Sequence, residues 1–240
     1  MHTQLEVNKF ADYCESTLRL HDKLIVNGET DPNQTFYKSL PLCIMDAVFS
    51  IGVNYNSVVK AENNFLKHVG LNVSRTSTQN EYTVGQFLAH MGEAPDFEQI
   101  AAEVYKNKQR TSSSKGILKA EAVYRVVKVF EKHGIDTLED FQSSHDRAGL
   151  DADILAVKGQ GSGIMLKYLY MLAGDADEVK PDRHMVNFMK GIFPHLTMAI
   201  KHHAEIKNIM REAVDALKVK YPQLTPRFLD FLIWDYQRKK

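Results

Sequence analysis

The chain has 240 residues, 30 basic and 30 acidic side chains, and a hydrophobic content of 44%. This length can bury a large core, and no apolar run approaches the roughly 18 residues that a membrane span needs. The two isolated cysteines, Cys14 and Cys43, indicate a reducing compartment without a disulfide framework, and their number excludes a four-cysteine iron–sulfur cluster. We therefore expect a globular protein that has no membrane association.

Helical patterns run through the chain in order, and no strand pattern occurs. Apolar residues recur every three to four positions, which is the period of one helix face. Pro181 and Pro226 stand where proline is tolerated, in the first turn of a helix. The patterns predict an all-α protein with helices over residues 5–27, 39–68 (two helices meeting near 52–54), 83–91, 96–105, 117–133, 137–142, 164–173, 181–189, 197–219 and 225–240, and a loop over 72–82.

Three alternating glycines, Gly159, Gly161 and Gly163, precede the predicted helix over residues 164–173. Glycine accepts a positive φ and lets another backbone come close, and the amides at the start of a helix can point at a phosphate. A dinucleotide-binding fold would need a buried strand before the glycines, but residues 151–157 are too polar for one. The glycines are therefore interpreted as a hairpin that joins two helices.

The residues Val157-Lys158-Gly159-Gln160-Gly161-Ser162-Gly163, a helix ending at Gly174, and then Pro181-Asp182-Arg183-His184 resemble the helix-hairpin-helix of the endonuclease III-like DNA glycosylases. That family typically has Leu-Pro-Gly-Val-Gly, a helix ending in Gly, and Val-Asp-Thr-His. Residues 46–55 and 116–122 resemble other parts of the same family, so the resemblance covers about residues 40–189. It implies a two-lobed helical fold, with one lobe over 40–150 and the other formed by 1–39 together with 151–240, which carries the helix-hairpin-helix at about 151–174.

The resemblance also implies an activity. It predicts a protein that binds double-stranded DNA and cleaves the bond between a flipped base and its sugar. Asp182 stands at the position of the family's carboxylate, which stabilises positive charge on the sugar; the alternative is that Asp182 only caps a helix. Gly163 stands at the position of the family's lysine, so no imine and no lyase activity are expected.

These residues favour a monofunctional DNA glycosylase, a hydrolase of base excision repair. The alternative is a catalytically inactive helix-hairpin-helix protein that binds nucleic acid or another partner. A third interpretation gives the hairpin no role beyond a tight turn. We expect a monomer that is cytoplasmic, and nucleoid-associated in a prokaryote, or else nuclear.

Two stretches are the candidates for contact with DNA. The basic loop, defined as residues 106–116, carries cations and hydroxyls suited to phosphate groups, although a solvated surface loop would have the same composition. The predicted DNA-binding residues are Lys108, Gln109, Arg110, Ser112 and Lys115 in the loop, and Gly159, Gln160, Gly161, Ser162 and Gly163 in the hairpin.

Two further sets of residues are singled out. Asn54 and Tyr55 are candidates to fill the gap left by a flipped base, because Gly52 stands where the family has Gln. Tyr55 and Tyr168 are candidates for a base pocket, although core packing is the ordinary role of such side chains. His195, His202 and Glu205 form no closed ligand set, so no metal is expected. No cofactor is expected, apart from a monovalent cation that the resemblance allows at the hairpin carbonyls.

Overall fold

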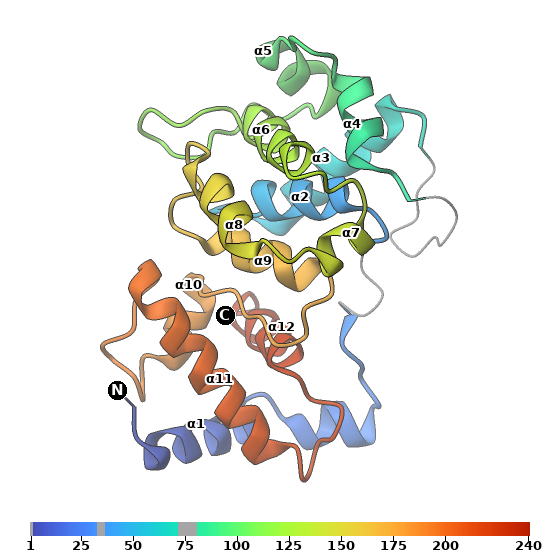
Figure 1. Ribbon diagram of the computed structural model, residues 1–240. Coiled ribbons are helices and arrows are strands. Elements are labelled where there is room, and N and C mark those ends of the chain that lie inside the picture. Colours follow the sequence, from blue (N-terminus) through green and yellow to red (C-terminus); the bar gives the residue numbers. More distant parts are fainter. Residues whose placement is uncertain (1, 33–36, 72–80) are drawn as a thin grey trace. The chain divides into compact units, whose positions relative to one another are not determined.

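A computed structural model of the chain describes residues 2–32, 37–71 and 81–240 (Figure 1). These residues form helices and their connections, and the described part has no strand beyond one isolated bridge between Arg110 and Leu118. The all-α prediction is confirmed. Residues 72–80 of the predicted loop over 72–82 lie outside the described residues. Within the described ranges, no helix is long and apolar enough to cross a bilayer.

The chain forms two compact units, each with its own hydrophobic core. Unit 1 consists of Met1–Gln34 and Gly174–Lys240, and unit 2 of Thr35–Ala173. The division expected from the sequence placed residues 151–173 with the two chain ends. They belong instead to unit 2, because Ile154, Leu169 and Leu172 are buried in its core.

Unit 2 is arranged around α2, a helix whose ten residues are all buried. Helices α3, α6 and α9 pack directly against α2, and α4 and α8 pack against α6. The helices of unit 2 are α2 (Leu40–Phe49), α3 (Tyr55–His68), α4 (Val84–Met91), α5 (Phe97–Gln99), the π-helix η3 (Ile100–Val104), α6 (Lys119–Lys132), α7 (Leu138–Ser143), α8 (Arg147–Ala156) and α9 (Ile164–Leu172).

The end of α2 is held by a buried lysine. Lys119 Nζ, at the start of α6, donates to the carbonyl oxygens of Phe49 and Ile51, each at 2.8 Å. The last carbonyls of a helix have no partner within that helix, so the ammonium group satisfies acceptors that burial would otherwise leave without water. The contact fixes the turn between α2 and α3.

Unit 1 joins segments from opposite ends of the sequence. Helix α1 packs against α11, and α12 packs against both α10 and α11. Phe193 and Phe228 are fully buried in the core of this unit. The helices of unit 1 are α1 (Gln4–Thr17), the π-helix η1 (His21–Val26), α10 (Arg183–Met189), the short η4 (Ile200–His202), α11 (His203–Leu217) and α12 (Pro226–Gln237).

The helix predicted over residues 5–27 is interrupted. Helix α1 ends at Thr17, Arg19 adopts a left-handed φ of 55°, and η1 begins at His21. In a continuous helix, Leu18 and Leu20 would point about 200° apart, so only one of them could face the core. The break lets both become buried, with exposed fractions of 2% and 0%. Burial of both side chains outweighs one unfavourable backbone conformation.

Candidate functional site

The predicted hairpin is a pair of tight turns between α8 and α9. The amide of Gln160 donates to the Val157 carbonyl at 2.9 Å, and the amide of Gly163 donates to the Gln160 carbonyl at 3.0 Å. Gly159 and Gly163 have φ values of 93° and 73°, a region that favours glycine. We call residues 157–163 the hairpin. Gly163 is the N-cap of α9 and offers no side chain to its amides.

The hairpin packs directly against the basic loop. A Cβ atom placed on Gly159 would lie 2.4 Å from both Cβ and Oγ1 of Thr111, so only glycine fits at this contact. The loop is closed at its base, where Thr111 N donates to the Ile117 carbonyl at 2.9 Å and Lys119 N to the Gln109 carbonyl at 2.8 Å. The two stretches singled out for DNA contact therefore lie side by side in unit 2 (Figure 1).

Most of the predicted DNA-contact residues are on the surface, namely Lys108, Arg110, Ser112, Lys115, Gly159, Gly161 and Ser162. Three others face the protein. Gly163 is buried at the start of α9, Gln160 is 3% exposed, and Gln109 Nε2 donates to Ser57 Oγ at 3.3 Å. These three shape the loop and the hairpin and offer little side-chain surface to a ligand.

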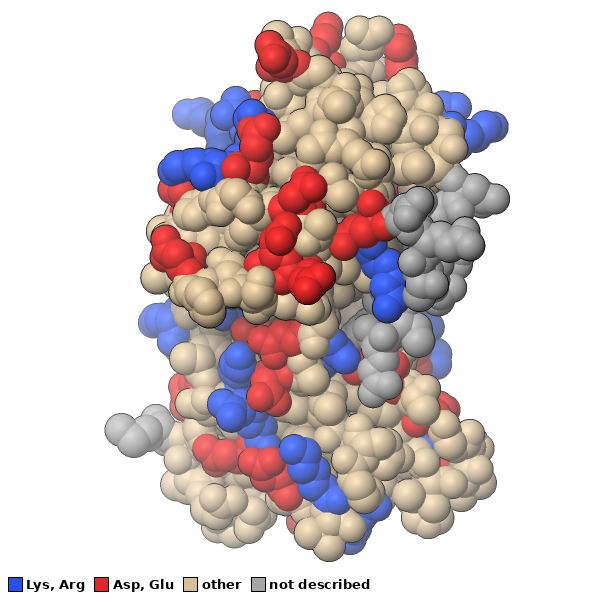
Figure 2. Space-filling view, turned by 45° about the vertical axis from the view of Figure 1, so that its right-hand side comes forward, with Lys and Arg blue, Asp and Glu red and all other residues tan. Residues whose placement is uncertain are grey.

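The cations of the loop are only partly neutralised. Glu98 lies 3.1 Å from Arg110 and 3.9 Å from Lys108, but all three side chains are more than half exposed, so water and salt screen these pairs. Lys115 and Lys158 make no ion pair with any described residue. Figure 2 shows Lys and Arg side chains gathered along one edge of unit 2, with Asp and Glu among them.

A groove of about 790 Å³ begins at the foot of the hairpin. Phe97 and Tyr124 line it and contact each other edge to face, with ring centroids 5.5 Å apart. The groove thus combines aromatic surface with charges of both signs. Its cations are Arg125, Lys128 and Lys158, and its carboxylates are Glu93 and Asp153.

Asp182 is the N-cap of α10 in unit 1. Its Oδ1 accepts hydrogen bonds from the amides of His184 at 2.8 Å and Met185 at 3.2 Å. Its Oδ2 makes no hydrogen bond with the described residues, and the side chain is half-buried. One oxygen therefore performs the capping role, and the other remains available for chemistry.

The residues predicted to replace a flipped base or to line a base pocket make different contacts within the protein. Asn54 is exposed and caps α3, with its Oδ1 accepting from Asn56 N at 3.0 Å. Tyr55 and Tyr168 are both half-buried and both hydrogen-bond to the fully buried Asp46 of α2. Burial, followed by the charge of Asp46, raises the pKa of the Tyr168 phenol well above its ordinary value. The two tyrosines are therefore brought together by a carboxylate.

A second buried carboxyl belongs to the same cluster. The hydroxyl of Tyr37 lies 2.8 Å from Asp46 Oδ2 and 2.6 Å from Glu62 Oε1. A phenol has one proton and can donate to only one of two carboxyl groups. The two carboxyl groups therefore lie within reach of the same hydroxyl proton. This cluster links α2, α3 and α9 within unit 2.

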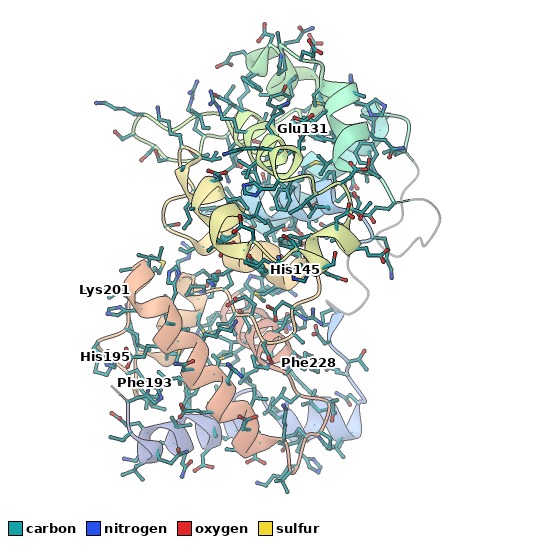
Figure 3. All side chains as sticks on the ribbon, in the orientation of Figure 1. Glu131, His145, Phe193, His195, Lys201 and Phe228 are labelled. Atoms are coloured by element: carbon teal, nitrogen blue, oxygen red, sulfur yellow. The ribbon has the colours of Figure 1, made fainter. Side chains whose placement is uncertain are left out.

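The histidines of unit 1 form ion pairs without forming a metal site. His195, in the connection between α10 and α11, has its Nε2 3.3 Å from Glu205 Oε1 (Figure 3). The ring of His202 lies 6.3 Å from that of His195 and is bonded through Nδ1 to Thr197. Among the described residues, no group of three or more His, Cys, Asp or Glu side chains is arranged to hold a metal ion.

Comparison with known proteins gives one match. A family described as a domain of unknown function, DUF8548, matches residues 11–238. The chain belongs to this family. No curated protein and no solved structure matches the chain significantly. The matched range takes in nearly all of both units, so the hairpin, the basic loop and Asp182 all lie within the DUF8548 domain.

Two buried acidic residues of this DUF8548 protein, Asp46 and Asp230, were not predicted from the sequence. Asp46 carries the only charge in α2, and an isolated charge in an apolar helix could have indicated a buried polar cluster. Asp230 is buried in α12 and accepts a hydrogen bond from the amide of Lys180, two residues before Asp182. Nothing in the local sequence distinguishes Asp230 from a surface carboxylate of an amphipathic helix.

Proposed function

We propose that the protein binds double-stranded DNA through the hairpin and the basic loop, and that it hydrolyses the N-glycosidic bond of a flipped, damaged or modified base. The two-lobed helix-hairpin-helix glycosylase fold is part of this proposal. The observation that carries it is the contact between Gly159 and Thr111. This contact places the exposed residues Gly159, Gly161 and Ser162 beside a loop rich in cations and hydroxyls.

The chemistry of this surface suits a phosphate backbone. Helix α9 begins without a side-chain cap, so no side chain neutralises the positive end of its dipole, which favours negative charge there. Lys115 and Lys158 add positive charge from the loop and from the hairpin. Contacts of this kind fix the position of a duplex and carry no sequence information.

Asp182 is the residue that we propose for the chemical step. Two helix amides bind Oδ1 and hold the carboxyl group in place, while Oδ2 can face the sugar or a water molecule. As the glycosidic bond breaks, its electrons leave with the base, which takes up a proton, and positive charge develops on the sugar. Water then adds to the sugar carbon and loses its proton to Asp182.

A binding protein without catalysis is the second candidate. The observation that favours it is the capping geometry of Asp182, because aspartate at an N-cap needs no further explanation. One experiment distinguishes the glycosylase from the binding protein. The protein is incubated with duplexes that contain uracil, alkylated or oxidised bases, and alkali is then added to break the strand at abasic sites. Strand breaks support the glycosylase, whereas duplex binding without breaks over the whole panel supports the binding protein.

We expect the triple variant Lys108→Ala, Arg110→Ala, Lys115→Ala to bind duplex DNA more weakly and with a flatter salt dependence. Each lost phosphate contact removes about 0.9 from the slope of log K against log salt, so the slope should fall by up to about 3. Fluorescence anisotropy over a salt series measures it. Replacement of the exposed Lys9, Lys201 and Lys218 of unit 1 by alanine controls for net charge. Equal slopes in wild type and in the loop variant would remove the loop from the interface.

Borohydride should trap no covalent complex between the protein and a duplex with an abasic site. The endonuclease III-like glycosylases have a lysine where this chain has Gly163, which carries no amine. Ser162 beside it cannot form an imine either. Denaturing gel electrophoresis after reduction tests this. A trapped adduct that disappears in the Lys158→Ala variant would show that the neighbouring lysine acts as a nucleophile.

A further inference from the structure

Asp230 lies on α12, is 6% exposed, and bonds to a peptide group close to Asp182. Its Oδ2 accepts a hydrogen bond from the amide of Lys180 at 2.5 Å. Backbone amides in an irregular segment have no helix partner, and a buried amide without an acceptor is strongly unfavourable. The carboxyl group thus supplies the acceptor that the segment before α10 lacks.

Lys180 is also hydrogen-bonded to Asp182, the proposed catalytic residue. Asp182 N donates to the Lys180 carbonyl at 2.7 Å, so residues 180–182 form a tight turn, which we call the Lys180 turn. Pro181 in its middle is buried and has a fixed φ. Oδ1 of Asp182 is then bonded to α10. Hydrogen bonds therefore link Asp230 through the Lys180 turn to the backbone amide of Asp182, whose carboxylate is held in turn by the amides of α10.

We infer that Asp230 is a positioning residue, which holds the Lys180 turn and thereby fixes the direction in which Asp182 Oδ2 points. This inference rests on the proposed function, because it concerns the same chemical step. Asp230 is buried and acts through Asp182, so it has no contact of its own with the substrate.

The charges around Asp230 are consistent with this role. Burial is the largest influence on the pKa of Asp230, the charge of Asp182 is the next, and both raise it well above its ordinary value; the charge of Glu178 raises it further. The amide of Lys180 and the charge of its side chain act in the opposite direction. A protonated Asp230 still keeps an oxygen to accept from the Lys180 amide.

Two substitutions separate the hydrogen bond from the charge. Asp230→Asn keeps a side-chain oxygen for the Lys180 amide, whereas Asp230→Leu has similar size and no acceptor. Thr225→Ala is the matched control, since Thr225 Oγ1 caps the same helix by accepting from Phe228 N at 3.1 Å, and its loss weakens α12 without touching the turn. Asp230→Ser, whose hydroxyl is too short to reach the turn, replaces Asp230→Leu if the leucine variant does not fold.

The experiment measures single-turnover base release, duplex affinity, the pH profile of the rate, and hydrogen exchange of the Lys180 amide by NMR. We expect Asp230→Leu to release base on the order of 100-fold more slowly, as for a misplacement of about 1 Å, with unchanged duplex affinity and faster exchange at Lys180. Asp230→Asn should keep the wild-type rate, pH profile and protection. Thr225→Ala should keep the wild-type rate per folded molecule.

The outcomes distinguish this inference from the proposed function. If the wild type releases base and Asp230→Leu does so equally fast, the positioning role is overturned and the proposed function stands. A rate in Asp230→Asn that falls as far as in Asp230→Leu would show that the charge acts and the hydrogen bond does not, which also overturns the inference. A wild type that releases no base from any duplex overturns the proposed function, and the positioning role with it.

Discussion

The Asp182→Asn variant is expected to lose base release by on the order of a hundred- to a thousand-fold, while its fold and duplex affinity stay close to those of the wild type. In the proposed mechanism, the substitution removes the negative charge that would face the developing sugar cation. It keeps a side-chain oxygen for the amides of His184 and Met185, so the cap of α10 is retained.

The measurement compares alkali-revealed abasic sites made by the wild type and by Asp182→Asn on the duplex from which the wild type releases base fastest. Thermal unfolding of both proteins shows whether the fold is intact. Asp146→Asn is a suitable control, because Asp146 is likewise an N-cap, accepting from Gly149 N at 2.9 Å at the start of α8. Equal rates in wild type and Asp182→Asn would leave Asp182 as a cap alone.

Gly159→Ala should destabilise unit 2 by roughly 2 kcal/mol or more, because the new methyl group meets Thr111 and an L-residue is strained at positive φ. Relief of the clash requires the hairpin and the basic loop to move apart. Their phosphate contacts would then no longer be presented together. We therefore also expect weaker duplex binding by the alanine variant.

The same hairpin provides a matched control. A Cβ atom on Gly161 would meet only the Leu155 carbonyl oxygen, at 3.8 Å, so Gly161→Ala should stay within about 0.5 kcal/mol of the wild type. Urea unfolding and duplex titration of the two variants measure the difference. Equal stability of Gly159→Ala and Gly161→Ala would show that the hairpin does not depend on its contact with Thr111.

The elements that were predictable from sequence are those that local patterns determine. The apolar run over residues 40–49 predicts α2, and Thr225 and Pro226 predict the start of α12. Capping and helical periodicity act within a few residues, so a local pattern is enough. The positions of Gly159 and Gly163 at positive φ follow from residue type. The interruption at Arg19 was not predictable, since it depends on which side chains the core of unit 1 receives.

The candidate site was predictable only in part, for the same reason. Asp182 could be placed at a helix start from its own neighbours, and the loop and the hairpin could be proposed from composition. The hydrogen bond from Lys180 to Asp230 and the convergence of Tyr55 and Tyr168 on Asp46 join residues that are far apart in sequence. Such contacts depend on helix packing, which a single sequence does not encode in any local pattern.

The division of unit 1 between the two ends of the chain affects how the protein assembles during synthesis. Helix α1 leaves the ribosome before unit 2, but its packing partner α11 begins only at His203, after unit 2. All of unit 2 lies between them in the sequence and can fold while α1 still has no partner. A folded unit 2 also shortens the flexible chain that must close when α1 meets α11, which lowers the entropy lost on closure. The apolar face of the nascent α1, which carries Val7 and Phe10, would therefore be exposed to water throughout this interval.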